Sequence, residues 1–179
     1  MHPMIKKVLV SEEQIVQRCQ ELGKHIDEEY KDNERPILLV ALLKGSVPFM
    51  AELMKRITID VQIDFMDVSS YDGTESIGDI KINKDLDGSC KGIDIILVED
   101  IVDTGRTIHT VKEMLLNKKA NSVKIIALLD KPSRRVVDIS ADYVGFEIEN
   151  EFVVGFGLDY DQNYRNLPYV GVLKEECYK

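Results

Sequence analysis

A hydrophobic run near the middle of the chain leads into residues that could hold a phosphorylated sugar. Residues 95–107 read IILVEDIVDTGRT, so two adjacent acids, Glu99 and Asp100, end the predicted strand and a third, Asp103, follows three residues later. The next segment opens a predicted helix, where free amides, hydroxyls and a glycine form a phosphate cradle. Carboxylates beside that cradle would repel a phosphate unless they bind sugar hydroxyls or a Mg²⁺ ion, directly or through water. The cradle residues are Thr104, Gly105, Arg106 and Thr107.

An acidic turn with a helix cap is the alternative explanation for Glu99 and Asp100 taken alone. The full order of strand, two acids, third acid, Thr-Gly-x-Thr and helix favours a binding site over that alternative. The sequence contains neither a GxxxxGK[ST] loop nor a GxGxxG fingerprint, so neither of these two nucleotide-binding motifs explains the segment.

The elements around this segment predict a sheet that would bring several loops together. Short apolar runs at 37–43 and 93–98 are typical of buried parallel strands. Their alternation with helical patterns predicts an α/β domain with a central, mostly parallel sheet flanked by helices. Ligands of such sheets lie at the carboxyl ends of the strands, where we expect the loops at residues 44, 100–107 and 131 to meet. We expect helices at 11–31, 47–55 and 107–117, strands at 37–43, 61–68, 80–82, 93–98, 123–129, 143–148, 152–155 and 169–173, and a long mobile loop at 69–79.

Composition bounds the class of protein. The chain has 179 residues, which fits one domain, and a net charge of −9, which counts against general binding to nucleic acid. No apolar run approaches the roughly 20 residues of a membrane helix, and residues 1–10 are too short and charged for a secretory signal. The three cysteines are far apart and contain no CxxC pair, so a disulfide framework or a structural zinc site is not expected. These features predict a cytoplasmic enzyme without a membrane or nucleic-acid partner.

The segment VEDIVDTGRT, residues 98–107, resembles the signature with which type I phosphoribosyltransferases bind phosphoribosyl pyrophosphate (PRPP). Other segments resemble the bacterial-type hypoxanthine-guanine phosphoribosyltransferases of that family, and the resemblance runs from about residue 8 to about residue 175. It implies a single domain with a core at about 35–148 and a small hood built from residues 1–10 and 149–179. Residues 1–10 are expected to join this hood or a subunit interface. The matching segments are a pyrophosphate loop at 43–45, a lid at 70–81, a base-recognition segment at 129–131, and hood segments at 144–147, 152–160 and 164–168.

The resemblance implies a Mg²⁺-dependent reaction in which N9 of hypoxanthine or guanine displaces pyrophosphate from PRPP, giving IMP or GMP. Glu99 and Asp100 are implied to hold the ribose hydroxyls and to place magnesium. Asp103 is implied to take or share the proton on the purine N7. The 5′-phosphate would lie on residues 103–107, with the side chain of Arg106 the least determined of these contacts.

The remaining roles are likewise implied by the resemblance. Pyrophosphate would contact Lys44, Gly45 and Arg165, with a non-proline cis peptide between Leu43 and Lys44. The base would receive a hydrogen bond from Lys131 at its 6-oxo group, a stacking contact from Phe152 and main-chain contacts at Val153. Asp159 would lie near position 2 of the base and near a second magnesium. Ser70 and Tyr71 would begin the lid. For most of these residues taken singly, a turn, surface or core role is the simpler explanation.

Three alternatives stay open at this point. The base could be xanthine, or the enzyme could serve another base such as orotate or uracil. A non-catalytic PRPP-binding regulator of RNA is a further alternative, although the acidic composition counts against it. The family resemblance also implies a homodimer or homotetramer.

Overall fold

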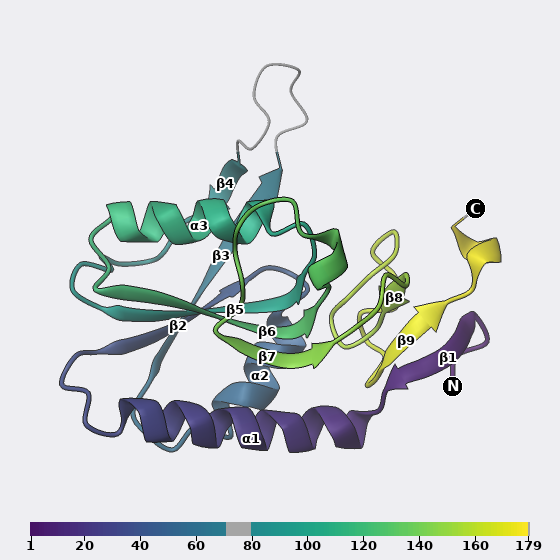
Figure 1. Ribbon diagram of the computed structural model, residues 1–179, viewed down its shortest axis with the longest axis horizontal. Coiled ribbons are helices and arrows are strands. Elements are labelled where there is room, and N and C mark those ends of the chain that lie inside the picture. Colours follow the sequence, from purple (N-terminus) through teal and green to yellow (C-terminus); the bar gives the residue numbers. More distant parts are fainter. Residues whose placement is uncertain (71–79, 179) are drawn as a thin grey trace.

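The computed structural model describes residues 1–70 and 80–178 and arranges them around two sheets (Figure 1). The larger sheet has six strands in the order β4-β3-β2-β5-β6-β7, and the smaller one has three in the order β1-β9-β8. All neighbours in the larger sheet are parallel except β3 and β4, which confirms the predicted mostly parallel α/β fold. The strands are β1 (Ile5–Val10), β2 (Ile37–Leu42), β3 (Gln62–Ser70), β4 (Ile80–Lys84), β5 (Asp94–Val102), β6 (Ser122–Asp130), β7 (Tyr143–Glu147), β8 (Val153–Val154) and β9 (Val170–Leu173).

Within residues 1–70 and 80–178, three α-helices cover the larger sheet: α1 (Glu12–Tyr30), α2 (Val47–Met54) and α3 (Arg106–Asn117). Figure 1 shows α1 and α2 on one face of the sheet and α3 on the other. The predicted capping box begins α1, because Gln14 N donates to Ser11 Oγ at 3.3 Å and Ser11 N donates to Gln14 Oε1 at 2.8 Å. None of the helices in the described part of the chain is long and apolar enough to cross a membrane.

The central strands are buried on both faces, which explains their unbroken apolar sequence. Leu39 and Ala41 of β2 belong to the core cluster under α1 and α2, whereas Leu38 and Val40 belong to the cluster under α3. All six residues of β2 are buried. Because successive strand residues point to opposite faces, a strand between two helical layers needs apolar residues at every position.

Strand β5 differs from the prediction, because it does not end at residue 98 but continues to Val102. The acidic pair therefore lies within the strand, where Glu99 pairs with Ala127 of β6 and Val102 pairs with Asp130. The ladder with β6 supplies backbone partners beyond the apolar run, so polar side chains do not end the strand here. Regular alternation is lost near the end of the strand, since Val98 and Ile101 pack in the core under α1 and α2 while Leu97 and Val102 pack in the core under α3.

The smaller sheet joins the two ends of the chain. Strand β1 pairs antiparallel with β9, and β9 pairs antiparallel with β8. Figure 1 shows the N- and C-terminal segments side by side at one end of the molecule. Strand β1 lies in a segment whose local sequence does not predict a strand. The other boundaries differ from the predicted ones by one or two residues, and two 3₁₀ turns, η1 (Pro132–Arg134) and η2 (Glu175–Cys177), complete the fold.

The expected lid lies partly outside the described residues. Ser69 and Ser70, which were expected in the loop, belong to β3 and pair with Lys81 and Ile80 of β4. Tyr71, together with the rest of 71–79, lies outside the part of the chain that the structure describes.

Candidate active site

Two cavities meet at the carboxyl ends of β5 and β6. The larger has a volume of about 420 Å³ and the smaller about 110 Å³. Ile101 and Asp103 line both of them, so these two residues form a shared wall. The site thus consists of a small polar compartment and a larger, partly apolar one, joined at β5.

The smaller cavity lies at the start of α3. Gly105 is the N-cap of this helix and has a left-handed backbone with φ of 84°. A β-carbon at Gly105 would lie 2.6 Å from Ile139 Cγ2, so the close packing requires glycine as well. Thr104, Gly105 and Thr107 line this cavity, and the amides of the first helical turn have no partners within the helix. Arg106 is exposed and does not line the cavity. This cavity lies at the residues for which the sequence predicts a phosphate cradle.

The ionised form of the acidic pair beside this cradle, Glu99 and Asp100, is disfavoured. Burial raises the pKa of Glu99 well above its usual range, and the adjacent charge of Asp100 adds to the rise. Burial also raises the pKa of Asp100 to about 6, against the effects of a hydrogen bond from Ile101 N at 2.7 Å and of the nearby positive charge of Arg165. Both acids keep partial contact with solvent. A cation or hydroxyl donors at this position would relieve the cost of holding both carboxylates ionised.

The loop after β2 packs directly on Asp100. The peptide bond between Leu43 and Lys44 is cis, as the family resemblance implied. A β-carbon at Gly45 would lie 1.6 Å from Asp100 Oδ2, and one at Gly157 would lie 1.8 Å from the carbonyl oxygen of Gly45. The two glycines therefore allow the loop after β2, strand β5 and the segment after β8 to come into direct contact.

Asp159 and Arg165 lie in this same region and form an ion pair. The Arg165 guanidinium lies 2.8 Å from Asp159 Oδ1 and donates to the carbonyl oxygen of Gly157 at 2.8 Å. Neither residue lines the two cavities, and neither does Lys44, which is exposed on the loop after β2. The contacts of Gly157 and Gly45 therefore bring Arg165 and Lys44, the residues expected to bind pyrophosphate, close to the acidic pair.

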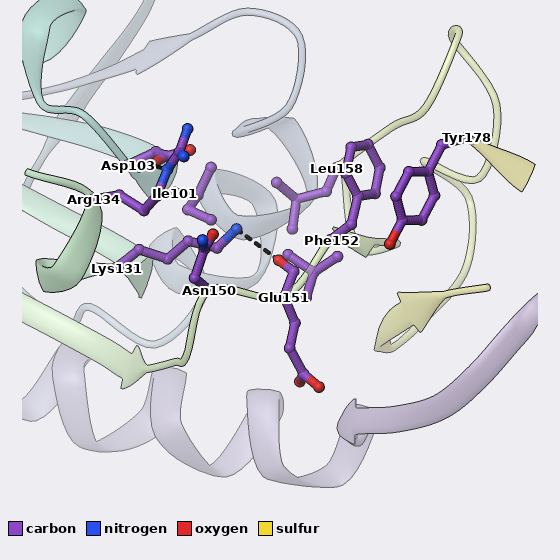
Figure 2. A pocket seen from close by; sticks show the side chains of 10 residues that line it. Ile101, Asp103, Lys131, Arg134, Asn150, Glu151, Phe152, Leu158 and Tyr178 are labelled. Atoms are coloured by element: carbon purple, nitrogen blue, oxygen red, sulfur yellow. Dashed lines mark hydrogen bonds and ion pairs between the residues drawn. The ribbon is translucent and has the colours of Figure 1, made fainter. Parts of the chain in front are cut away.

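The larger cavity contains the predicted base-recognition residues, as Figure 2 shows. Lys131 is only 7% exposed, and its Nζ donates to the carbonyl oxygen of Glu151 at 2.7 Å. Burial lowers the pKa of Lys131, and the charge of Asp103 opposes that change. Val153 is buried at the cavity wall, while Phe152 is 38% exposed. A planar ligand with a hydrogen-bond acceptor fits a cavity of this composition.

Asp103 lines both cavities and forms an ion pair with Arg134 of the turn η1. Its Oδ1 lies 3.1 Å from Nε of Arg134, and its carbonyl oxygen accepts a hydrogen bond from Arg135. Arg135 also pairs with Asp130 at the end of β6. These contacts link the end of β5 to the segment that follows β6.

Among the described residues, six that line the larger cavity had no predicted role in the site. Ile101 lies inside the predicted acidic segment, yet the loss of regular alternation near the end of β5 hides its direction from the sequence pattern. Arg134 and Leu158 are close in sequence to predicted residues, yet nothing in the pattern indicates their direction. Asn150, Glu151 and Tyr178 give no local signal, and only the tertiary fold brings them to the cavity.

The carboxylates do not form a metal site by themselves. Within residues 1–70 and 80–178, no group of three or more His, Cys, Asp or Glu side chains is arranged to hold a metal ion. Mg²⁺ commonly takes one or two carboxylates and completes its coordination with substrate phosphates and water. The pair at Glu99 and Asp100 fits such a partial site, because two adjacent carboxylates supply the oxygen ligands that Mg²⁺ takes and burial disfavours their ionised form when no cation is bound.

Comparison with known proteins agrees with this geometry. Residues 7–161 match the family model described as "Phosphoribosyl transferase domain". The chain is 59% identical over 175 residues to the hypoxanthine-guanine phosphoribosyltransferase of Streptococcus agalactiae and 57% identical over 175 residues to that of Streptococcus pyogenes, covering in each case 97% of this chain and 96% of the relative.

Solved structures give the same result. The hypoxanthine phosphoribosyltransferase of Staphylococcus aureus superposes with a TM-score of 0.95 at 50% identity, over 100% of this chain and 97% of that one. The Trypanosoma cruzi enzyme in complex with the product IMP superposes with a TM-score of 0.94 at 38% identity, over 99% of both chains. The resemblance found in the sequence is confirmed, and the chain belongs to the phosphoribosyltransferase family, among its hypoxanthine-guanine phosphoribosyltransferases.

Proposed function

We propose that the protein salvages purines by transferring the phosphoribosyl group of PRPP to N9 of hypoxanthine or guanine, giving IMP or GMP and pyrophosphate. The observation that carries the proposal is the wall shared by the two cavities. Ile101 and Asp103 separate a phosphate cradle from a cavity that contains a buried lysine. A sugar phosphate in one cavity and a base in the other would meet at this wall. Relatives at 57–59% identity carry the name of this activity.

The larger cavity recognises the base. Lys131 donates to the 6-oxo oxygen of hypoxanthine or guanine, and adenine offers no acceptor at that position. The hydrogen bond from Lys131 to the carbonyl oxygen of Glu151 fixes the direction of the amine and leaves other Nζ protons free for the base. Phe152 stacks on the purine, and the main chain at Val153 contacts the base edge.

The smaller cavity and the acidic pair hold PRPP. The amides and hydroxyls of residues 103–107, among them Thr104 and Thr107, bind the 5′-phosphate at the N-terminus of α3. Glu99 and Asp100 hold the ribose hydroxyls. Lys44 and Arg165 bind the pyrophosphate, supported by the contacts of Gly45 with Asp100 and Gly157.

Bound Mg²⁺ supplies positive charge to the pyrophosphate leaving group. Glu99 and Asp100 would hold it on the ribose side, directly or through water. Asp159 would hold a second ion on the pyrophosphate, where its pairing with Arg165 keeps the carboxylate next to the pyrophosphate contacts.

Asp103 takes or shares the proton on the purine N7 while N9 attacks the anomeric carbon and the bond from that carbon to the pyrophosphate oxygen breaks. Its position in the lining of both cavities supports this role, because the carboxylate would then lie beside both reactants. A positioned carboxylate is an effective acceptor when its proton affinity is close to that of its partner.

The proposal includes the arrangement and setting that the family resemblance implies. These are one domain with a core at about 35–148 and a hood from residues 1–10 and 149–179, a cytoplasmic location, and assembly as a homodimer or homotetramer. The pairing of β1 with β9 supports a hood made from both ends of the chain.

A turnover assay tests the proposal. The purified protein is incubated with PRPP and Mg²⁺ and, separately, with hypoxanthine, guanine, xanthine, adenine, uracil and orotate, and a parallel series contains a chelator. We expect Mg²⁺-dependent product with hypoxanthine and guanine and none with adenine or the pyrimidines. Turnover of xanthine would widen the base specificity. PRPP binding without turnover of any base would contradict the proposal and favour a regulator.

A further inference from the structure

The proposed stacking residue, Phe152, is unusually open for a large apolar side chain. It directly precedes β8 and is 38% exposed at the edge of the larger cavity. A partly exposed phenyl ring loses side-chain freedom when a ligand orders it, and that loss weakens binding. A contact that holds the ring before the base arrives would remove part of this cost.

Tyr178 makes such a contact. Its ring stacks on that of Phe152 with centroids 4.6 Å apart and planes 18° apart. Tyr160 meets Phe152 edge to face at 5.6 Å, with an interplanar angle of 84°. Figure 2 shows the ring of Tyr178 on the side of Phe152 away from Ile101 and Lys131.

Backbone hydrogen bonds fix the C-terminal segment, residues 173–178 (the tail), next to this contact. Leu173 N at the end of β9 donates to the carbonyl oxygen of Phe152 at 2.9 Å, and Lys174 N donates to that of Met4 at 3.0 Å. The turn η2 then places Tyr178, whose N donates to the carbonyl oxygen of Glu175 at 3.2 Å. The two rings are therefore joined both through their faces and through the strand that carries the tail.

We propose that Tyr178 is a positioning residue for base binding, which backs Phe152 so that its opposite face is ready to receive the purine. The base lies between Phe152 and the wall at Ile101, with its 6-oxo oxygen toward Lys131. This inference rests on the proposed function, because it assigns a supporting role in the site where that function places the base.

Steady-state kinetics of Tyr178→Ala, Tyr178→Leu and Tyr178→Phe test the role of the ring. Loss of the ring in the Ala and Leu variants raises the KM for hypoxanthine about two- to twelvefold, the effect of losing one aromatic pair. The KM for PRPP and kcat stay unchanged, and Tyr178→Phe behaves as the wild type because it keeps the stacking face. Tyr178→Leu keeps an apolar side chain of similar bulk, so it still tests the role of the ring if Tyr178→Ala destabilises the fold. Glu176→Ala is the matched control, since it removes an exposed tail side chain and no ring.

A double-mutant cycle with Phe152→Leu tests whether Tyr178 acts through Phe152. In the Phe152→Leu background, Tyr178→Leu causes no further rise in the KM for hypoxanthine. An equal rise in both backgrounds overturns the proposal, and so does an unchanged KM. A lower KM in Tyr178→Leu also overturns it, because the ring would then obstruct the base. Absence of wild-type turnover refutes the proposed function itself, whereas normal wild-type turnover with an unaffected Tyr178→Leu variant refutes only this inference.

Discussion

Replacing Asp100 by asparagine is expected to stabilise the substrate-free protein while it impairs the enzyme. Asp100 is held beside Glu99, and burial raises its pKa from 3.8 to about 6. Folding therefore favours the protonated carboxyl, and above pH 6 the folded protein bears the cost of an ionised one. Asparagine keeps the shape and can still accept the hydrogen bond from Ile101 N, but it removes the charge.

The magnitude follows from the difference between the two pKa values. A rise from 3.8 to about 6, with each pKa unit corresponding to about 1.4 kcal/mol, gives about 3 kcal/mol at pH 7.5 as an upper bound. Partial contact with solvent reduces this value, so we expect a gain of about 1 to 3 kcal/mol in the free energy of unfolding. The melting temperature of a chain of this size rises by about 2 to 4 °C per kcal/mol.

The sign of the pH dependence distinguishes this cause from a change in packing. Since the folded pKa lies above the unfolded one, the wild type loses stability as the pH rises from about 4 to about 6, and the variant does not. Its advantage should be complete at pH 7.5 and about half as large at pH 5.

Urea unfolding of both proteins at the two pH values measures this advantage, with the exposed Asp138→Asn as a control. An Asp100→Asn variant that is no more stable than the wild type at pH 7.5, or that gains equally at pH 5, would refute the reasoning. The same variant should turn over PRPP poorly, because it removes a proposed ligand of Mg²⁺.

Three further substitutions separate the parts of the site. Asp103→Asn should lower kcat about 10²- to 10⁴-fold with little change in PRPP affinity, measured by turnover and by PRPP titration, and an unchanged kcat would remove Asp103 as the proton acceptor. Lys131→Ala should raise the KM for hypoxanthine about tenfold to a hundredfold and leave the KM for PRPP unchanged, whereas an equal loss for both substrates would indicate a structural role. Gly45→Ala should lower turnover about a hundredfold, because its methyl group would meet Asp100 Oδ2 at 1.6 Å. In the control Gly88→Ala the new methyl group meets nothing within 4 Å, so its turnover should equal that of the wild type. Equal turnover of the two variants would contradict the packing argument.

The sequence predicts the elements of this fold whose signals are local. The capping box at Ser11 and Gln14 marks the start of α1 within one residue, because both partners lie within one helical turn. The apolar run of β2 identifies a strand buried on two faces. These features depend on neighbours in the chain, so one sequence contains the information.

The errors arise where pairing between distant segments overrides the local pattern. Glu99 and Asp100 resemble the end of a strand, yet the ladder with β6 carries β5 on to Val102. Strand β1 is stabilised by β9, about 165 residues later, and its local sequence alone gave no strand prediction. The cavity residues show the same limit, since Tyr178 reaches Phe152 only through the tertiary fold.

The antiparallel pairing of β1 with β9 also affects the order in which the nascent protein can fold. Strands β2, β5 and β6, which carry the phosphate cradle and the acidic pair, are all synthesised before residue 131, so their sheet can form on the ribosome. Strand β1 is made before these strands but pairs with β9, and β8, which follows Phe152, pairs with the same strand. The half of the site that binds the sugar phosphate can therefore form before β9 is made, whereas the half that selects the base is completed only after β9 has joined the smaller sheet.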